Sequence, residues 1–335
     1  MRLEVSLAAV STRSQCLAVV AITLAVAIAA CGPGDKSSAD SVASRRAIAS
    51  ADSTRVVTAS AHDPEGSVRR TADPGVTLEP GEPPVVTVIA HDYAFSFPSL
   101  TSVPAGPVTF RMINAGKELH MMGVVWLGTH TFKEFISAVQ GDSTFPGPYE
   151  VGGPDAVAPG DTSYATVILE PGHVALACWV VGEDGKMHVA KGMMATLDVV
   201  PTSSRVAAEP EVDVALTLRD YAIDMSSAPA PGNRTFRVEN RGPAEHDVEL
   251  FRMEPGATVA DIDAWFHHPG KGSARARPIG GMVGLEHGHH GWFTANLPPG
   301  DYVAVCWIPG EKGVPHYAGH GMMRWFRVVA AVRRT

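Results

Sequence analysis

Short apolar segments that are rich in valine and bounded by glycine or proline recur along the chain after residue 84. Segments of this length with β-branched residues and turn residues at their ends predict β-strands. A first series of predicted strands covers residues 85–90, 108–113, 122–127, 163–169, 174–181 and 194–200. A second series runs in the same order from residues 212–218 to residues 325–329. Short strands at this spacing predict an all-β protein built from Greek-key β-sandwiches.

Each series of strands is interrupted once by the start signal of a helix. Thr131 stands three residues before Glu134, and Thr258 stands three residues before Asp261. A threonine followed at this spacing by an acidic residue forms a capping box, in which each side chain accepts a hydrogen bond from the other residue's backbone. We therefore expect one short helix in each series and a low helix content.

The two series carry the same sequence words in the same order. Asp92-Tyr93-Ala94 recurs as Asp220-Tyr221-Ala222, and Pro171-Gly172 recurs as Pro299-Gly300. The repeat length of roughly 125 residues is that of a domain and is too long for a solenoid repeat. We therefore predict two tandem copies of one domain.

Composition sets the boundaries of these copies. We assign residues 84–200 to the first copy, residues 211–335 to the second copy, and the stretch at 201–210 to a linker. Residues 31–83 contain no phenylalanine, tryptophan or tyrosine, so they cannot bury enough apolar surface to offset the entropy of ordering. They are predicted to form a disordered tether.

Near the end of each copy the same potential metal donors appear in the same order. A cysteine followed by tryptophan comes first, then a histidine, then Gly-Met-Met. The cysteine, the histidine and the first methionine are Cys178, His188 and Met193 in the first copy and Cys306, His316 and Met322 in the second copy. A thiolate, an imidazole and a thioether suit a copper ion that changes oxidation state. A lone buried cysteine is more often a packing residue, but packing does not require this repetition.

Both copies resemble the cupredoxins, the family of blue copper domains to which plastocyanin and azurin belong. In that family a first histidine follows a strand and an Asn-x-Gly turn, as His120 follows Asn114 and His246 follows Asn240. The remaining ligands come late in the domain in the order Cys, His, Met, which both copies match. The resemblance covers nearly all of residues 84–329 and rests on the combined order of these residues.

The resemblance implies a type 1 copper site in each copy, hence up to two copper ions per chain. The ligands that it implies are His120, Cys178, His188 and Met193 in the first copy and His246, Cys306, His316 and Met322 in the second copy. Met194 is an alternative to Met193. In the second copy five residues rather than four separate His316 from Met322, and His320 is a competing imidazole.

Three functions are open for such a protein. It is an electron carrier, a protein that binds or delivers copper, or an enzyme that resembles multicopper oxidases or copper nitrite reductases. Enzymes of the last class need further copper held by a histidine beside the cysteine, whereas Ala177 and Val305 stand there. We therefore expect one-electron transfer with an unknown redox partner protein rather than an enzyme. A metal-free binding module with the cupredoxin fold is the further alternative.

The second copy also has a histidine-rich loop with His287, His289 and His290. The corresponding loop of the first copy, residues 158–162, contains no histidine. We interpret this loop as a solvated one rather than as a second kind of metal site.

The N-terminus has the pattern of a bacterial export signal. Arg2 and Arg13 precede an apolar stretch at residues 17–30 that is short for a membrane span. Small residues lead directly into Cys31, which resembles the lipidation box of bacterial lipoproteins. We predict a signal peptide at 1–30 and an exported protein that lipid on Cys31 holds to the membrane at the cell envelope, on its periplasmic or extracellular face. An ordinary cleaved signal and a retained membrane helix are the alternatives.

Charge excludes one class of partner. The chain carries 27 Lys plus Arg against 35 Asp plus Glu, a net charge of −8, and no basic run is interleaved with aromatic residues. A nucleic-acid partner is therefore not expected. If Cys16 leaves with the signal and Cys31 takes lipid, one cysteine remains in each copy, and these equivalent positions do not favour a disulfide.

Overall fold

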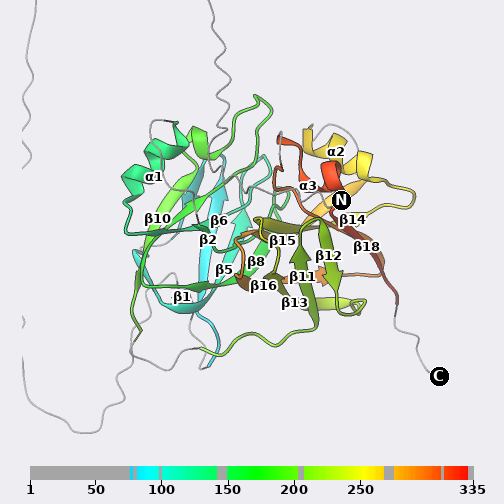
Figure 1. Cartoon of the computed structure of the whole chain (residues 1–335), viewed down its shortest axis with the longest axis horizontal. Coiled ribbons are helices and arrows are strands. Elements are labelled where there is room, and N and C mark those ends of the chain that lie inside the picture. The colour runs from blue at the N-terminus through cyan, green and yellow to red at the C-terminus, as the bar shows by residue number, and fades with distance from the viewer. Residues whose placement is uncertain are drawn as a thin grey trace, which may run out of the picture. The chain divides into compact units, whose positions relative to one another are not determined.

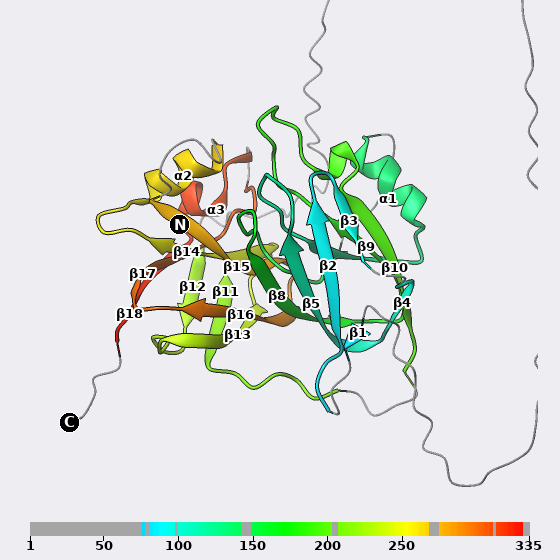
Figure 2. The ribbon, with the colours of Figure 1, turned by 180° about the vertical axis from the view of Figure 1, so that it is seen from behind.

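The computed structural model describes residues 76–77, 81–97, 100–141, 149–202, 207–267, 275–310 and 313–330 (Figures 1 and 2). No helix among these residues is long and apolar enough to cross a membrane. The predicted signal peptide, the lipidation site Cys31 and most of the predicted tether lie outside them. Near the end of that tether, β1 (Val76–Thr77) pairs antiparallel with β2.

The first copy is a β-sandwich. One of its sheets contains β2, β5 and β8, and the other has the strand order β4-β10-β9-β6-β7. β2 runs parallel to β5, and β8 runs antiparallel to β5. The elements of this copy are β2 (Val85–His91), β3 (Ala94–Ser96), β4 (Ser102–Pro104), β5 (Gly106–Asn114), β6 (Gly123–Gly128), α1 (Phe132–Val139), β7 (Tyr149–Glu150), β8 (Thr162–Leu169), β9 (Gly172–Ala177), η1 (Val189–Lys191) and β10 (Met194–Val200).

The second copy repeats this arrangement. β12, β11, β13 and β16 share one sheet, and the other has the order β15-β14-β17-β18. The elements of this copy are β11 (Val214–Arg219), β12 (Ala222–Met225), β13 (Gly232–Asn240), β14 (His246–Met253), α2 (Val259–His267), β15 (Ala276–Leu285), β16 (His290–Leu297), β17 (Gly300–Val305), α3 (His316–His320) and β18 (Met323–Val328). The predicted all-β fold of two Greek-key sandwiches is confirmed.

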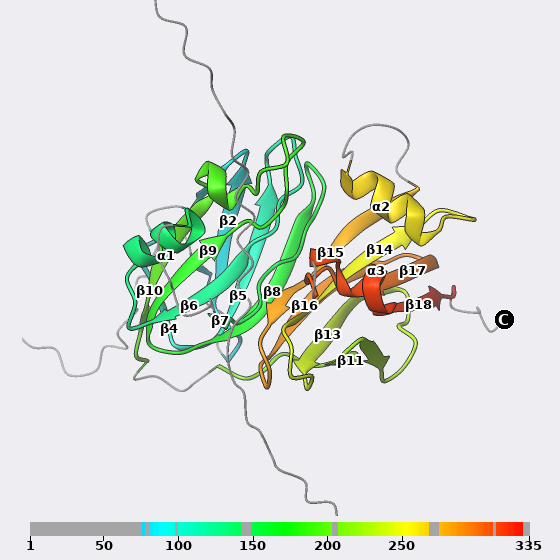
Figure 3. The same cartoon turned by 45° about the horizontal axis from the view of Figure 1, so that its top comes forward.

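Burial alternates along the strands because successive side chains point to opposite faces of a sheet. In β2, Val86, Val88 and Ala90 are buried and their neighbours are partly exposed, as expected for a strand with one face on a core. β9 is different, because its last four residues are all buried. The helix α1 covers the outer face of this strand (Figure 3), and Phe135 of α1 belongs to one hydrophobic cluster with Ala175 of β9.

Both predicted helices are present with their capping interactions. The backbone N–H of Thr131 donates to Glu134 Oε2 at 2.7 Å, and the N–H of Glu134 donates back to Thr131 Oγ1 at 3.2 Å. At the start of α2 the N–H of Thr258 donates to Asp261 Oδ2 at 2.7 Å. One further turn of helix, η1 or α3, follows the cysteine in each copy. The sequence did not predict these turns.

One predicted strand is shorter than expected. The segment predicted at 174–181 leaves the sheet after Ala177, the last residue of β9. Beyond it the N–H of Cys178 donates to Met193 O at 3.2 Å, and the N–H of Val189 donates to Cys178 O at 2.9 Å. The cysteine therefore starts a folded loop, because its backbone pairs with the loop that carries the next histidine.

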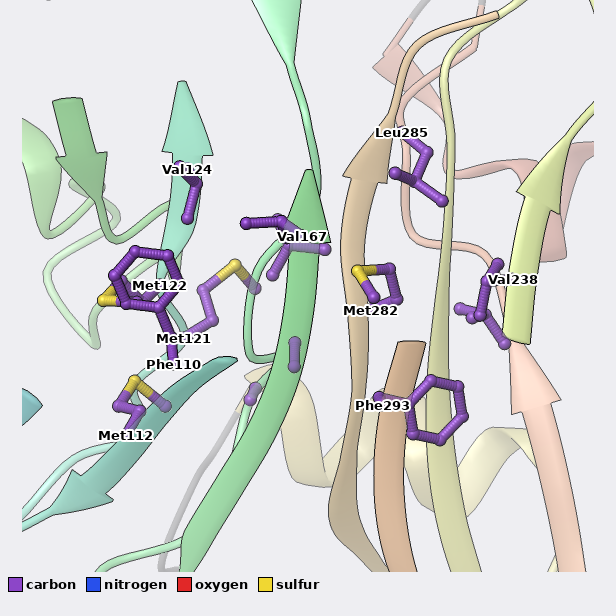
Figure 4. Packing of buried hydrophobic residues seen from close by; sticks show 14 of the residues in the cluster. Phe110, Met112, Met121, Met122, Val124, Val167, Val238, Met282, Leu285 and Phe293 are labelled. Atoms are coloured by element: carbon purple, nitrogen blue, oxygen red, sulfur yellow. The ribbon is translucent and has the colours of Figure 1, made fainter. Parts of the chain in front are cut away.

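The two copies are joined edge to edge. β8 of the first copy pairs antiparallel with β16 of the second copy, with Val167 opposite Gly291 and Tyr164 opposite Thr294, so one sheet of nine strands runs through both. One hydrophobic cluster also contains residues of both copies, among them Met122 and Met282 (Figure 4). The copies therefore share a core, which the predicted linker alone does not require.

A second joint runs between residues 149–157 and β15. The N–H of Gly153 donates to Met282 Sδ at 3.3 Å, and Gly153 O accepts from Val283 N at 3.0 Å. Gly153 has a φ of 143°, and a Cβ there would lie 2.0 Å from Met122 O. Only glycine fits this close approach of backbones.

Buried carboxyl groups gather at these joints. Glu150, Asp155, Asp247 and Glu249 are each at most 5% exposed. Burial raises the pKa of each group, and the negative charge of the neighbouring carboxyls adds to the shift for Glu150, Asp247 and Glu249. Carboxyls in such surroundings favour the neutral, protonated form.

We predict that the Asp155→Asn variant gains stability relative to the native chain as the pH rises. Burial raises the pKa of Asp155 to about 7 in the folded protein. The group therefore stabilises the fold below its unfolded pKa, and this contribution is lost as the pH rises through about 7. Since one pKa unit corresponds to about 1.4 kcal/mol, the gain at pH 8 is at most about 4 kcal/mol.

Thermal unfolding at pH 5 and pH 8 measures this difference. The exposed Asp224→Asn variant is the control, and we expect the same shift in Tm at both pH values for it. An Asp155→Asn shift that does not grow with pH would contradict the prediction.

Candidate metal centres

In the first copy the structure brings three predicted donors together. Cys178 Sγ lies 3.6 Å from His188 Nδ1 and 4.0 Å from His120 Nδ1. The two Nδ1 atoms are 3.2 Å apart. All three residues are fully buried. They come from different places in the chain: His120 precedes β6, Cys178 follows β9, and His188 caps the turn η1.

The second copy has the same geometry. Cys306 Sγ lies 3.6 Å from His316 Nδ1 and 3.8 Å from His246 Nδ1. The two Nδ1 atoms are again 3.2 Å apart. His246, Cys306 and His316 are at most 3% exposed. Among the residues that the structure describes, these are the two groups of three or more such donors that could hold a metal ion.

The donor set fits copper. Separations of 3.2 to 4.0 Å between donors suit one shared ion with bonds of roughly 2 Å. Burial lowers the pKa of all four histidines, and for His316 the positive charge of neighbouring histidines lowers it further. Both effects favour the neutral imidazole, which is the form that binds a metal. Two imidazoles and one thiolate are the donors of a type 1 copper site.

Carboxylates behind the histidines fix their orientation. Asp92 Oδ1 lies 3.2 Å from His120 Nε2, and Asp220 Oδ1 lies 2.9 Å from His246 Nε2. An Nε2–H that donates to a carboxylate leaves Nδ1 unprotonated, so its lone pair faces the cysteine sulfur. The same contact in both copies therefore sets the tautomer in which Nδ1 can bind a metal.

The turn that carries each aspartate is strained. The residues after them, Tyr93 and Tyr221, have φ angles of 65° and 68°, in the left-handed region that tyrosine rarely adopts. Each ring then lies edge-on against the second histidine, with centroids 5.1 Å from His188 and 5.2 Å from His316. Strain of this kind is kept where the surrounding structure fixes it, as these packed rings do.

Asparagines hold the loops of the first histidines. Asn114 Nδ2 donates to Glu118 O at 2.9 Å and to Val157 O at 2.8 Å, while its Oδ1 accepts from Gly116 N. Asn240 makes the equivalent three bonds in the second copy. Both side chains are fully buried, so these bonds satisfy backbone groups that are otherwise shielded from water. These asparagines therefore fix the loops that carry the first histidines.

Backbone amides face the sulfur atoms. Cys178 accepts hydrogen bonds from the N–H groups of Met121 and Val180. Cys306 accepts from those of Asp247 and Ile308. Burial nevertheless raises the pKa of Cys178 to about 12, so a bound cation is needed to keep this thiol ionised at neutral pH. Both cysteines are free, as the sequence predicts.

The methionine ligands stay predictions that the placement supports. Met193 and Met322 are fully buried in the same cluster as the cysteines, whereas Met194 packs toward α1. The N–H of Met193 donates to His188 O at 3.0 Å. His320, the competing imidazole, is exposed and stacks on Tyr221 with ring centroids 3.7 Å apart.

The two centres differ in one carboxylate. Glu118 Oε2 lies 2.9 Å from His188 Nε2 in the first copy. Counting from the asparagines, the equivalent residue of the second copy is Ala244, and its neighbour Glu245 points elsewhere. The first centre therefore has carboxylates on both histidines and the second centre has one on His246 only, among the contacts that the structure describes.

The histidine-rich loop makes other contacts. His287 Nδ1 lies 2.8 Å from Gly242 O, and His290 lies edge-on against Trp292 with centroids 5.2 Å apart. These contacts place two of its imidazoles against protein groups. Its interpretation as a solvated loop stays a prediction.

The carboxylates that contact the histidine donors were not predicted from the sequence. Asp92 and Asp220 occupy the same position in both copies, and this repetition is the pattern that could have identified them. Glu118, Glu150 and Glu245 have no partner at the same position of the other copy. Only the folded chain shows what they contact.

No family model matches the chain. No curated protein matches it either. A solved auracyanin from Roseiflexus castenholzii is 17% identical, with 35% of this chain and 97% of that chain covered and a TM-score of 0.27. A multicopper oxidase is 15% identical, with 76% and 92% covered and a TM-score of 0.24. A copper nitrite reductase from Nitrosomonas europaea is 16% identical, with 73% and 93% covered and a TM-score of 0.23. Because these values are low, the cupredoxin-like fold is assigned from the chain's own strand pairings and paired His-Cys-His groups.

Proposed function

We propose that this protein binds copper at two type 1 centres and carries single electrons. The observation that carries the proposal is the pair of buried His-Cys-His groups with matching geometry. Bound copper would supply the one-electron change between its two oxidation states. The residues that would hold it are His120, Cys178, His188 and Met193 in the first copy and His246, Cys306, His316 and Met322 in the second copy.

The surroundings of the donors favour electron transfer over copper delivery. The histidines and cysteines are at most 3% exposed, so the protein excludes water from them and a partner cannot reach the ion directly. The asparagines and the carboxylates hold the donors in place, which keeps the geometry constant when the charge changes. Ala177 and Val305 stand beside the cysteines, where the oxidase-like alternative requires histidine.

We predict that copper-loaded protein shows the intense visible band of thiolate-to-copper charge transfer. Cys178→Ser and Cys306→Ser should each remove about half of this band, because each copy contributes one thiolate. The measurement is visible absorption together with copper content and the spin resonance signal of the ion. The control is His320→Gln, which we expect to leave the band unchanged, since this exposed ring stacks on Tyr221.

Two results would contradict the predicted copper ligands. A colourless protein without bound copper would leave the metal-free alternative. A band that His320→Gln reduces would assign the ligand role to His320.

We also predict that the first centre has the lower reduction potential. The negative charge of Glu118 beside His188 favours the more positive oxidised state, and Ala244 gives the second centre no such charge. Glu118→Gln should raise the potential of the first centre by roughly 60 mV, which is a tenfold change for one electron. Ala244→Glu should lower that of the second centre.

Redox titrations in chains that also carry Cys306→Ser or Cys178→Ser isolate one centre at a time. The exposed Glu170→Gln is the control for a general change in charge. Unchanged reduction potentials in both Glu118→Gln and Ala244→Glu would contradict the proposed difference between the centres.

We propose further that the chain is exported and attached to the membrane through lipid on Cys31, as the N-terminal sequence indicates. Cys31→Ser should move the protein from the membrane fraction to the soluble fraction after cell fractionation. Membrane association that survives this change would favour a retained helix, and a soluble native chain would favour an ordinary cleaved signal.

A further inference from the structure

A continuous chain of bonded groups leads from one centre to the other. Trp179 follows Cys178 directly, and its indole Nε1–H donates to Glu150 Oε1. Glu150 in turn shares a hydrogen bond with the carboxyl of Glu245. Glu245 directly precedes His246, a predicted ligand of the second centre. The contact between Glu150 and Glu245 therefore crosses from the first copy to the second.

Two glycines make room for this chain of groups. A Cβ on Gly123 would lie 2.8 Å from Trp179 Nε1 and 2.9 Å from Glu150 Oε1. A Cβ on Gly284 would lie 2.0 Å from Glu245 Oε1 and 2.4 Å from Glu150 Oε2. Any larger residue at these positions would push the paired groups apart. Both contacts thus depend on the absence of a side chain beneath them.

Burial keeps the contact between the two carboxyls intact. Glu150 is 4% exposed. Burial raises the pKa of Glu150, and the negative charge of Glu245 adds to this shift. A hydrogen bond between two carboxyls needs a proton on one of them, and burial favours the protonated form of Glu150, whose Oε2 meets Glu245 Oε1 over Gly284. The pair can therefore stay bonded without a bridging cation.

The contact between Glu150 and Glu245 does not follow from the repeat, because the first copy has no carboxyl at the position of Glu245. Counting from the asparagines, Glu245 of the second copy corresponds to Leu119 of the first copy, which is buried in the core. The carboxyl therefore stands only in the copy and at the position where it faces Glu150. The equivalent tryptophan, Trp307, packs against Tyr317 with ring centroids 4.5 Å apart.

We propose that Trp179, Glu150 and Glu245 form the route by which an electron passes between the two centres. Electrons tunnel faster along covalent and hydrogen bonds than across gaps, and here two hydrogen bonds complete the connection. The transfer oxidises one centre by one electron and reduces the other by one, so no further reactant is needed. This inference rests on the proposed function, and the charge of Glu118 sets its direction from the first centre to the second.

Pulsed one-electron reduction of copper-loaded protein tests the route. In the native chain the pulse should be followed by an electron transfer between the centres whose rate does not depend on protein concentration. Trp179→Phe, Glu150→Ala and Gly284→Ala should each slow this phase by about tenfold or more, because each breaks at least one hydrogen bond of the contiguous network and Glu150→Ala breaks both. Glu150→Gln keeps an acceptor for the indole and a donor for Glu245, so it should restore most of the rate.

The matched control is Trp307→Phe, which removes the equivalent indole of the second copy outside the route. It should leave the phase within about twofold of the native rate, as expected for a residue outside the network. The copper-free protein gives a second reading, by magnetic resonance of the Trp179 indole N–H. Its proton should exchange slowly with water in the native chain and in Glu150→Gln, and rapidly in Glu150→Ala.

The outcomes separate the route from the proposed function. Unchanged transfer rates in Trp179→Phe and Glu150→Ala, with both charge-transfer bands present, would overturn the route alone. Equal slowing by Trp307→Phe would overturn it as well, because the effect would then be nonspecific. A native chain that binds no copper would overturn the proposed function and the route with it.

Discussion

Each centre depends on keeping three buried donors directed at one another. Two imidazole nitrogens 3.2 Å apart, both with lone pairs facing inward, gain nothing from each other. Their orientation comes from behind, where Asp92 and Asp220 accept the opposite N–H. Asn114 and Asn240 then hold the loops by bonding buried carbonyl groups. The backbone contacts of the surrounding sandwich thus serve this one arrangement, which explains why they recur in both copies.

Duplication preserved the donors and changed their electrostatic surroundings. Each copy has a glutamate in the loop before its first histidine, and Glu118 lies one position earlier in that loop than Glu245 does. Glu118 faces the second histidine of its own centre, whereas Glu245 faces the other copy. Moving a carboxylate by one residue along a loop therefore turns it from a group that tunes one centre into a group that lies between two. Because the donor sets are equal, a difference in potential between the centres has to arise from such neighbours.

The strands, both helices and the grouped donors could be predicted from sequence, because each leaves a local or repeated pattern. Valine-rich segments mark the strands, and Thr131 with Glu134 marks a helix start. The end of β9 at Ala177 could not be predicted, since the apolar run continues and only the hydrogen bond from Cys178 to Met193 ends the strand. The pairing of β8 with β16 left no signal either, because an edge strand that meets another copy looks like any half-buried strand.

The joint between the copies fixes the separation of the two centres. Copies connected by a linker alone would hold their centres at variable separation, and a fixed path between them could not exist. Here the shared sheet and core fix the separation, although burying several carboxyls at the joint costs stability at high pH. Two of those carboxyls hold the residue after each cysteine, since Glu150 accepts from the Trp179 indole and Asp247 accepts from Trp307 N at 2.7 Å. The joint therefore keeps buried carboxyls where they contact the residue next to each cysteine, which is expected where an interface is kept for function rather than for packing alone.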